Sequence, residues 1–298
     1  MLATLVVSAV MIAAIRMAPR ETSRAEDRSA ATRPARTDPR GPTTRNAEPT
    51  FSVASYNINY GNADLKTVVK TIKQANADLV CLQETNRTSQ LYLQRRLRAA
   101  YRYSVFYGGG RGADGFAFMS KTPITKRKRL PAKFKYFDTW FCTVKLDGRD
   151  VRIVNVHLRP FNPRGVQTLA QALRRMGQAE LWRMKEIAYI HSVIPDDTPV
   201  IVAGDFNAPP VMASAAYLTD RGFIDSFAAV NPDHAKHVTW RWRYKGMDWR
   251  YRLDYIFSSR DMLPCTSRII VSNASDHYLV LTGFRWPETP KPANRQKQ

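Results

Sequence analysis

Short apolar runs that stop at a polar residue limit the folds that this chain can adopt. Residues 51–57, 78–83, 151–158 and 199–204 are typical of buried strands, and each ends at or next to an asparagine, an acid or a histidine. Six further segments have strand character: 115–120, 140–146, 239–244, 251–258, 269–271 and 279–284. Residues 65–75 have apolar positions at helical spacing, and 165–193 indicate a helix with some interruption. Many strands with few long helices predict an α/β sandwich of two packed sheets flanked by helices.

The two ends of the chain differ from this middle part. Residues 2–15 form an apolar run without ionisable side chains, short for a membrane span of about 20 residues. We expect a hydrophobic signal or membrane anchor at 1–16 and a disordered linker at 17–49. A globular domain at 50–286 and a disordered tail at 287–298 follow. These features predict a monomer, membrane-anchored or secreted, with an extracytoplasmic domain and association with a membrane through its apolar segment.

The chain is strongly basic, with a formal net charge of +21. The ends, 1–50 and 287–298, carry +3 and +2, which leaves +16 for residues 51–286. This excess indicates an anionic partner such as nucleic acid, acidic lipid or a phosphate-rich small molecule, or else a basic surface that is merely solvated. Cys81, Cys142 and Cys265 are odd in number and form no CxxC pair, so neither a disulfide framework nor a zinc site is indicated.

Eight polar residues gather at or near the ends of the expected strands. Each alone has an ordinary explanation, such as a turn residue, a helix cap or a satisfied buried histidine. Together they offer the oxygen ligands that hard divalent cations prefer, so we predict Mg²⁺ or Mn²⁺ and no organic cofactor. The eight are Asn57, Glu84, His157, Asp205, Asn207, Asp254, Asp276 and His277.

The motifs around these residues resemble a known family. SYNIN, LQET, VNVHLRP, VAGDFNAPP, YRLDYIF and SDH occur in the order found in the endonuclease/exonuclease/phosphatase superfamily, which includes DNase I-like nucleases and bacterial sphingomyelinases. The resemblance covers about residues 50–286. It implies a four-layer α/β sandwich of two packed, mostly antiparallel sheets flanked by helices. It also implies a divalent-metal-dependent phosphoesterase that hydrolyses a phosphodiester substrate.

The resemblance implies a role for each metal ligand. Glu84 would be the main ligand with Asn57 beside it, and Asp276 would be a further metal or structural ligand. A divalent cation held in advance stabilises the negative charge that develops on phosphoryl oxygens.

The remaining five residues would act on water and phosphate. Asp205 would orient and deprotonate the attacking water, and Asn207 would hold the phosphate and the nucleophile. His277 would hydrogen-bond a phosphoryl oxygen, with Asp254 beside it to keep it charged. His157 would contact the phosphate or assist the leaving group.

Some positions depart from particular subfamilies. Abasic-site enzymes usually follow the glutamate motif with a lysine, whereas Thr85 follows Glu84 here. Inositol-polyphosphate 5-phosphatases usually have a tryptophan before the GD pair and an arginine after the asparagine, where this chain has Ala203 and Ala208. Both departures argue against these two subfamilies.

Residues 239–254 alternate aromatic and basic side chains around a turn near 246–248. If both runs are extended, one face is aromatic and the other basic, and the basic face would lie beside Asp254 and the phosphate. The alternative is a hairpin that packs its aromatics into the core and leaves its arginines solvated. The basic cluster at 126–129 is interpreted as a solvated loop.

The basic clusters favour nucleic acid as the substrate. A lipid-headgroup phosphodiesterase of the sphingomyelinase type is the alternative enzyme. A non-catalytic basic module that binds nucleic acid or membranes is the alternative from another class.

Overall fold

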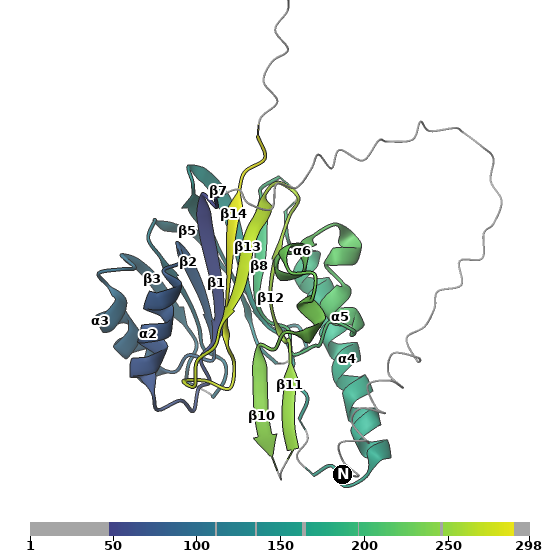
Figure 1. Cartoon of the computed structure of the whole chain (residues 1–298). Coiled ribbons are helices and arrows are strands. Elements are labelled where there is room, and N and C mark those ends of the chain that lie inside the picture. Colours follow the sequence, from purple (N-terminus) through teal and green to yellow (C-terminus); the bar gives the residue numbers. More distant parts are fainter. Residues whose placement is uncertain are drawn as a thin grey trace, which may run out of the picture.

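Two six-stranded sheets pack face to face and form the centre of the protein (Figure 1). The computed structural model describes residues 48–110, 112–134, 136–162, 165–195, 197–244 and 247–288. The α/β class and the four-layer arrangement are confirmed. The predicted signal or anchor lies outside these ranges, as does almost all of the predicted linker and tail. None of the helices in the described part of the chain is both long and apolar enough to cross a membrane.

The order of the strands brings distant segments side by side. The first sheet runs β13 (Leu263–Ile270), β14 (Leu279–Arg285), β1 (Phe51–Asn57), β2 (Leu79–Gln83), β4 (Phe116–Ser120), β3 (Tyr103–Tyr107). The second runs β5 (Ile124–Leu130), β6 (Thr139–Leu146), β7 (Arg149–His157), β8 (Val200–Asp205), β12 (Asp254–Ser258), β9 (Ile224–Asp225). The pairs β1–β2 and β7–β8 are parallel, and the other neighbours are antiparallel, as expected.

The central strands are apolar on both faces because both faces are covered. In β1 and β2, Val53 and Leu79 point into the core between the sheets, whereas Ala54 and Val80 point to the helix layer. This alternation follows from the period of two in a strand. Cys81 and Cys142 are buried in the core between the sheets, and all three cysteines are free, which agrees with the sequence interpretation.

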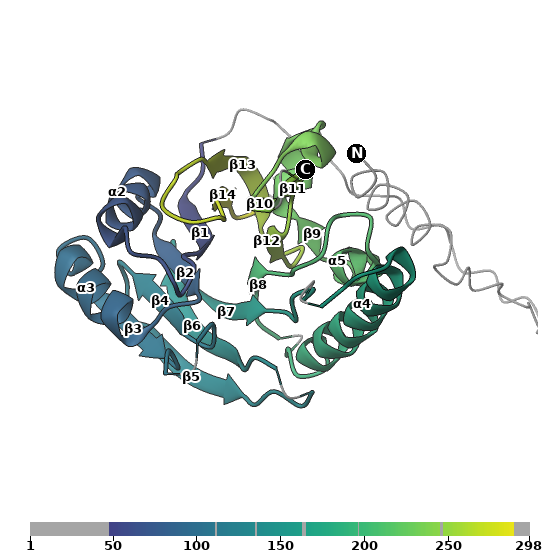
Figure 2. The same ribbon diagram turned by 90° about the horizontal axis from the view of Figure 1, so that it is seen from below.

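Helices form the outer layers, as the end-on view shows (Figure 2). Two helices cover the first sheet, α2 (Leu65–Ala75) and α3 (Arg87–Leu97), and the apolar side of α2 lies in the same cluster as the outer residues of β1. The second sheet is covered by α4 (Leu169–His191) and α5 (Ala213–Ala216). The short helices α6 (Ser226–Val230), η1 (Thr219–Arg221) and η2 (His234–Lys236) complete the fold.

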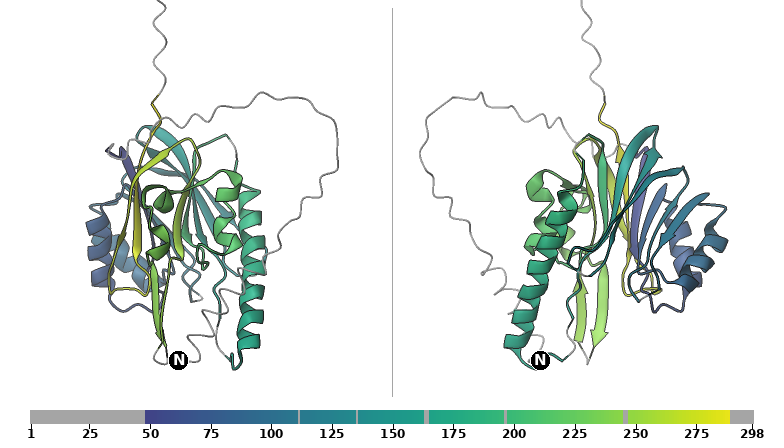
Figure 3. Two further views of the ribbon diagram at one scale, coloured as in Figure 1. Left: turned by 45° about the vertical axis from the view of Figure 1, so that its right-hand side comes forward. Right: turned by 180° about the vertical axis from the view of Figure 1, so that it is seen from behind.

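The expected helix at 165–193 is a single uninterrupted helix, α4, with Gly177 inside it. Its start is fixed by a capping box, in which the Thr168 side chain accepts from the Gln171 backbone N–H and the Gln171 side chain accepts in return. The amino-terminal end of α4 extends beyond the sheets on the same side as a separate hairpin, β10 (Trp240–Tyr244) and β11 (Met247–Tyr251) (Figure 3).

Two expectations about strands are wrong. Residues 251–258 do not form one strand, because the chain leaves β11 at Tyr251 and enters the second sheet only at Asp254, where β12 begins. The basic cluster at 126–129 is not a loop but part of the edge strand β5, whose main chain pairs with β6 while its charged side chains stay exposed. Exposed charges are a common feature of edge strands, since they discourage pairing with another chain.

Candidate active site

The polar residues predicted from the sequence meet at one end of the two sheets. In the parallel pair β1–β2, Asn57 lies opposite Gln83, the residue before Glu84. In the parallel pair β7–β8, His157 lies opposite Asp205. The antiparallel neighbour β12 starts there and sets Asp254 opposite Asp205. Because the sheets pack face to face, residues far apart in the sequence share one site.

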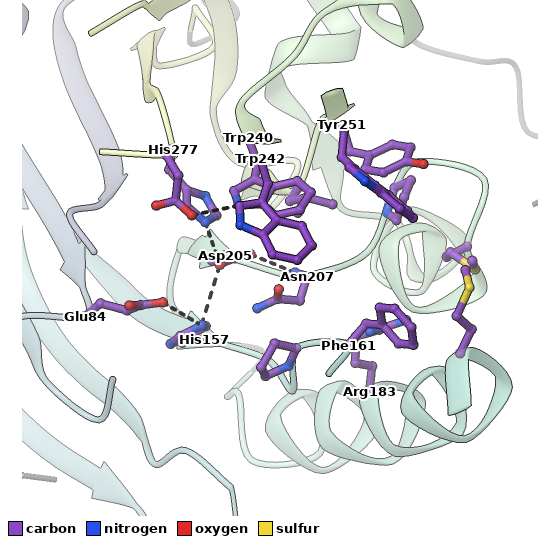
Figure 4. A pocket seen from close by; sticks show the side chains of 17 residues that line it. Glu84, His157, Phe161, Arg183, Asp205, Asn207, Trp240, Trp242, Tyr251 and His277 are labelled. Atoms are coloured by element: carbon purple, nitrogen blue, oxygen red, sulfur yellow. Dashed lines mark hydrogen bonds and ion pairs between the residues drawn. The ribbon is translucent and has the colours of Figure 1, made fainter. Parts of the chain in front are cut away.

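The carboxylate of Asp205 lies at the centre of this site (Figure 4). Asn57 Nδ2 donates to Asp205 Oδ2 and to Glu84 Oε1, both at 3.0 Å. His157 Nε2 lies 3.5 Å from Asp205 Oδ2 and 3.7 Å from Glu84 Oε1. The residues predicted as metal ligands and those predicted as catalytic are therefore in one cluster, with Asn57 connecting the two carboxylates.

His277 lies between two acids. Its Nδ1 is 2.9 Å from Asp254 Oδ2, and its Nε2 is 3.6 Å from Asp205 Oδ2. Burial alone lowers the pKa of this histidine, but the Asp254 and Asp205 carboxylates outweigh burial and raise the pKa to about 10. His277 is therefore charged at neutral pH. Thr239 Oγ1 accepts from the backbone N–H of Asp254 and helps to fix its position.

Asp205, Glu84 and His157 differ from His277, because burial favours their uncharged forms. Burial raises the pKa of Asp205 to about 7, although His277 opposes the shift, and burial also raises the pKa of Glu84. Burial and the positive charge of His277 lower the pKa of His157 to about 3, so His157 is neutral. A site with one charged histidine, one neutral histidine and a carboxylate that titrates near neutrality can both bind a phosphate and accept a proton.

Two of these residues have left-handed backbone conformations, Glu84 with φ 58° and Asn207 with φ 50°. The Glu84 carboxylate accepts from the Tyr60 backbone N–H through Oε2. The Asn207 N–H donates to Asp205 Oδ1 at 2.8 Å, and Asn207 Nδ2 donates to the Leu158 carbonyl at 3.0 Å. Such conformations are strained in residues other than glycine and cluster at functional sites.

Asp276 is held on the side of the site next to the hairpin. Its Oδ1 accepts from Asn59 Nδ2 at 2.9 Å, and its Oδ2 accepts from Trp240 Nε1 at 3.0 Å. Asn59 and Trp240 thus fix both oxygens of this carboxylate. Its predicted part as a metal or structural ligand stays a prediction.

The donor set fits a divalent cation. Ligand atoms of Asp205, Asp254 and His277 lie within 4.8 Å of one another. A charged imidazole has no lone pair to offer, however, so His277 is a poor ligand. Glu84 is the better ligand, because burial raises the pKa of its carboxylate and a cation beside it would oppose that shift.

The site opens into a pocket of about 330 Å³ between the hairpin and α4. Sequence reasoning missed four of its other lining residues: Phe161, Met176, Arg183 and Met212. It also missed Phe137, whose ring stacks on His157 with centroids 4.0 Å apart. Asn59, which holds Asp276, is the one further site residue that the sequence indicates. An asparagine two residues after Asn57 is well suited to a left-handed turn at the end of the strand.

The expectation that the hairpin places cations beside the phosphate site is wrong. The pocket is lined by Trp240, Trp242, Trp249 and Tyr251, the aromatic face. The register sets Arg241 opposite Arg250 and Arg243 opposite Asp248 on the other face. There all three arginines converge on Asp248, at 2.6 to 3.8 Å. The aromatics do not enter the core either, because the hairpin extends beyond the sheets.

The fold and this site together define a class: sandwich hydrolases that assemble carboxylates, an asparagine and a histidine–aspartate pair at one end of two sheets. Residues 54–277 match the sequence model of the Endonuclease/Exonuclease/phosphatase family, and the chain belongs to this family. The resemblance stated from the motifs is confirmed, and the chain is a phosphoesterase of that family.

A curated relative is the inositol phosphosphingolipids phospholipase C of Schizosaccharomyces pombe (strain 972 / ATCC 24843). It is 24% identical over 291 residues, which cover 80% of this chain and 67% of the relative.

Solved structures share the fold at low identity. The D. rerio TDP2 complexed with single strand DNA product has a TM-score of 0.61 and 18% identity, over 79% of this chain and 98% of that one. The AP Endonuclease from Archaeoglobus fulgidus has a TM-score of 0.60 and 16% identity, over 78% of this chain and 99% of that one.

Proposed function

We propose that the chain is a Mg²⁺- or Mn²⁺-dependent phosphodiesterase that acts on nucleic acid. The observation that carries the proposal is the buried pair of His277 and Asp254 beside the Asp205 carboxylate. It supplies a permanent positive charge and a base that titrates near neutral pH within one site, which are what hydrolysis of a phosphodiester needs.

The cation would be held by Glu84, with Asp276 as a further ligand, and Asn57 beside them would orient the Glu84 carboxylate. Asn57 Oδ1 accepts from the Asn59 N–H, which keeps the amide turned so that Nδ2 faces both carboxylates. When bound, the cation supplies charge stabilisation at the phosphoryl oxygens and lowers the pKa of water.

The remaining steps belong to side chains of this chain. Asp205 takes the proton of the attacking water, since its pKa of about 7 is close to the working pH. His277 donates a charged hydrogen bond from Nε2 to a non-bridging phosphoryl oxygen while Asp254 holds Nδ1. Asn207 orients the phosphate, and neutral His157 contacts it or the leaving group.

Nucleic acid is supported as the substrate by the net charge of +21. Positive charge attracts a polyanion and steers its association, and the attraction weakens with salt. The chain of TDP2 that shares this fold was crystallised with a single-stranded DNA product, which makes nucleic acid a reasonable first substrate to test.

A lipid phosphodiester is the second candidate. It is favoured by the relative from Schizosaccharomyces pombe, whose name describes a phospholipase C for inositol phosphosphingolipids. The aromatic and apolar lining of the pocket also suits a substrate with an apolar part.

The test is hydrolysis of a substrate panel by the full chain with Mg²⁺, with Mn²⁺ and with EDTA. The panel holds single-stranded and duplex DNA, RNA, a sphingolipid phosphodiester in vesicles and a phosphomonoester. We expect metal-dependent cleavage of nucleic acid that is lost in Glu84→Ala and His277→Ala. Absence of turnover on every substrate would refute the proposal, and polyanion binding that ignores EDTA would support a binding module instead.

We further propose that the protein is a monomer whose domain lies outside the cytoplasm, attached to or released from a membrane through residues 2–15. Cell fractionation with protease protection and the mass of the purified chain in solution would test these two points.

A further inference from the structure

The inner face of the β10–β11 hairpin forms a continuous aromatic surface. We call Trp240, Trp242, Trp249 and Tyr251 the hairpin wall. Cross-strand pairing sets Trp240 opposite Tyr251 and Trp242 opposite Trp249. The Trp240 ring is nearly parallel to those of Tyr251, at 11°, and Trp242, at 29°, with centroids 6.2 to 6.3 Å apart. All four side chains line the pocket, so a ligand in the pocket meets an aromatic surface.

The hairpin wall begins at the catalytic residues. Trp240 Nε1 donates to Asp276 Oδ2, and the ring of Trp240 lies 6.3 Å from that of His277. The main chain joins them too, since Arg241 N–H donates to the Asp276 carbonyl. A group attached to a phosphate at His277 therefore reaches the wall directly.

The other side of the pocket is apolar as well. Phe161 lies across from Trp242 (Figure 4), and Met176 and Met212 contribute thioethers. Among the described residues that line the pocket, Arg183 is the one lysine or arginine, and its Nη2 is 3.0 Å from Glu180 Oε2. The space next to the catalytic residues is thus suited to a flat uncharged group and not to a second phosphate.

The size of the pocket limits what can enter. A volume of about 330 Å³ is near the lower end of the ~300–1000 Å³ typical of small-molecule sites. A base that lies against the wall has to be unstacked from its neighbours, as in enzymes that take a base out of a duplex.

On the basis of the proposed phosphodiesterase function, we infer that the hairpin wall binds the base of an unpaired nucleotide adjacent to the scissile phosphate. The wall lines the pocket beside His277 and Asp276, and proteins that bind single strands use such aromatic side chains as stacking platforms for bases. Stacking depends on the π-face that every base has, so the wall selects single-stranded substrate with little preference for sequence.

The experiment compares three substrates with the full chain in Mg²⁺: a single-stranded oligonucleotide, the same strand with abasic residues, and the duplex. We expect kcat/KM for the base-bearing strand to exceed that for the abasic strand by about 5- to 150-fold, the range for base–aromatic stacking. In Trp242→Ala this ratio falls towards one, mainly through KM, and Trp242→Phe restores most of it.

Arg243→Ala is the matched control, because Arg243 is the next residue of the same strand but lies on the outer face. We expect it to keep the wild-type ratio. Thermal unfolding of each variant shows whether it folds. If Trp242→Ala does not fold, the comparison of the three substrates with the wild-type chain still tests the inference.

Equal turnover of base-bearing and abasic strands by the wild-type chain would overturn this inference and leave the proposed phosphodiesterase function intact. Turnover of a sphingolipid phosphodiester in vesicles, without turnover of oligonucleotides and with loss in Trp242→Ala, would assign the wall to a lipid instead. Absence of turnover on all of them would refute the proposed function and this inference together.

Discussion

His277 Nδ1 lies 2.9 Å from Asp254 Oδ2, and the side chains are only 6% and 0% exposed. The second nitrogen of the same ring lies 3.6 Å from Asp205 Oδ2. The pKa of about 10 for His277 and of about 7 for Asp205 give neighbouring groups different tasks at neutral pH. His277 stays charged for the phosphate, whereas Asp205 can accept a proton.

Replacing Asp254 with asparagine removes the acid that keeps His277 charged. We expect kcat to fall by about 10²- to 10³-fold, the usual effect of losing one preorganised charge-stabilising group. The alkaline limb of the kcat profile should also move from near the His277 pKa of about 10 to lower pH, since Asp254 contributes more than the other carboxylates that raise this pKa. A pH–rate series measures both effects. An unchanged alkaline limb in Asp254→Asn would show that the pair does not set this protonation.

Replacing Asp205 with asparagine should stabilise the protein while it abolishes activity. Burial raises the pKa of Asp205 from 3.8 to about 7, so the folded state binds this proton more tightly than the unfolded state. The penalty for the buried charge is therefore absent below about pH 4, grows as pH rises, and is complete above about pH 7. In EDTA at pH 8 we expect Asp205→Asn to gain on the order of 1–4 kcal/mol in urea unfolding.

The same series at pH 4 is the control for this prediction. The gain should be much smaller there, because the folded wild-type carboxyl is protonated and the unfolded one, with a pKa near 3.8, is about half protonated. A variant that is less stable than wild type at pH 8 would contradict the burial argument.

The site residues at the ends of strands could be predicted from the sequence, because each follows an apolar run that is typical of a buried strand. The apolar run before Asp205 has to be a buried strand, and parallel strands end at the same edge of a sheet. Asn57 and Glu84 were found in this way and meet at one carboxylate pair. The motif order added the roles, which no single residue type could give.

The pocket could not be predicted from the sequence, because the position of the hairpin relative to the sheets decides which side chains line it. Alternation showed that the hairpin has two faces, but not which face turns to the site. The break between Tyr251 and Asp254 decides this, since β11 belongs to the separate hairpin and β12 to the second sheet. Phe161 and Met176 come from a loop and a helix face without any local signal for binding.

Magnesium should stabilise the wild-type protein through Glu84. At a Mg²⁺ concentration of about 100 times Kd, we expect the free energy of unfolding to rise by about 2.7 kcal/mol, and EDTA should reverse the gain. Glu84→Gln should lose most of it, because an amide is a weaker ligand than a carboxylate. Asp233→Asn, a change at a 70% exposed side chain directly before η2, should keep the whole gain. Thermal unfolding with and without Mg²⁺ is the measurement. Equal Mg²⁺ effects in both variants would exclude Glu84 as a main ligand.

Arg252 lies in the break between the hairpin and the second sheet. Its Nη2 is 2.7 Å from Asp225 Oδ2, with side chains 2% and 12% exposed, and its guanidinium lies 4.4 Å from the Tyr255 ring centroid. Arg252→Ala leaves the Asp225 charge buried and unpaired, which costs about 3–5 kcal/mol. Arg250→Ala removes an exposed arginine from the outer face and should cost less than about 1 kcal/mol.

A double-mutant cycle separates the ion pair from the packing of Arg252 on Tyr255. Adding Asp225→Asn to Arg252→Ala should recover part of the lost stability, because the unpaired buried charge is then gone. The measurement is urea unfolding of the wild-type chain, both single variants and the double variant. If the double variant is as unstable as the sum of the single variants, the ring contact and not the ion pair holds the hairpin to the second sheet.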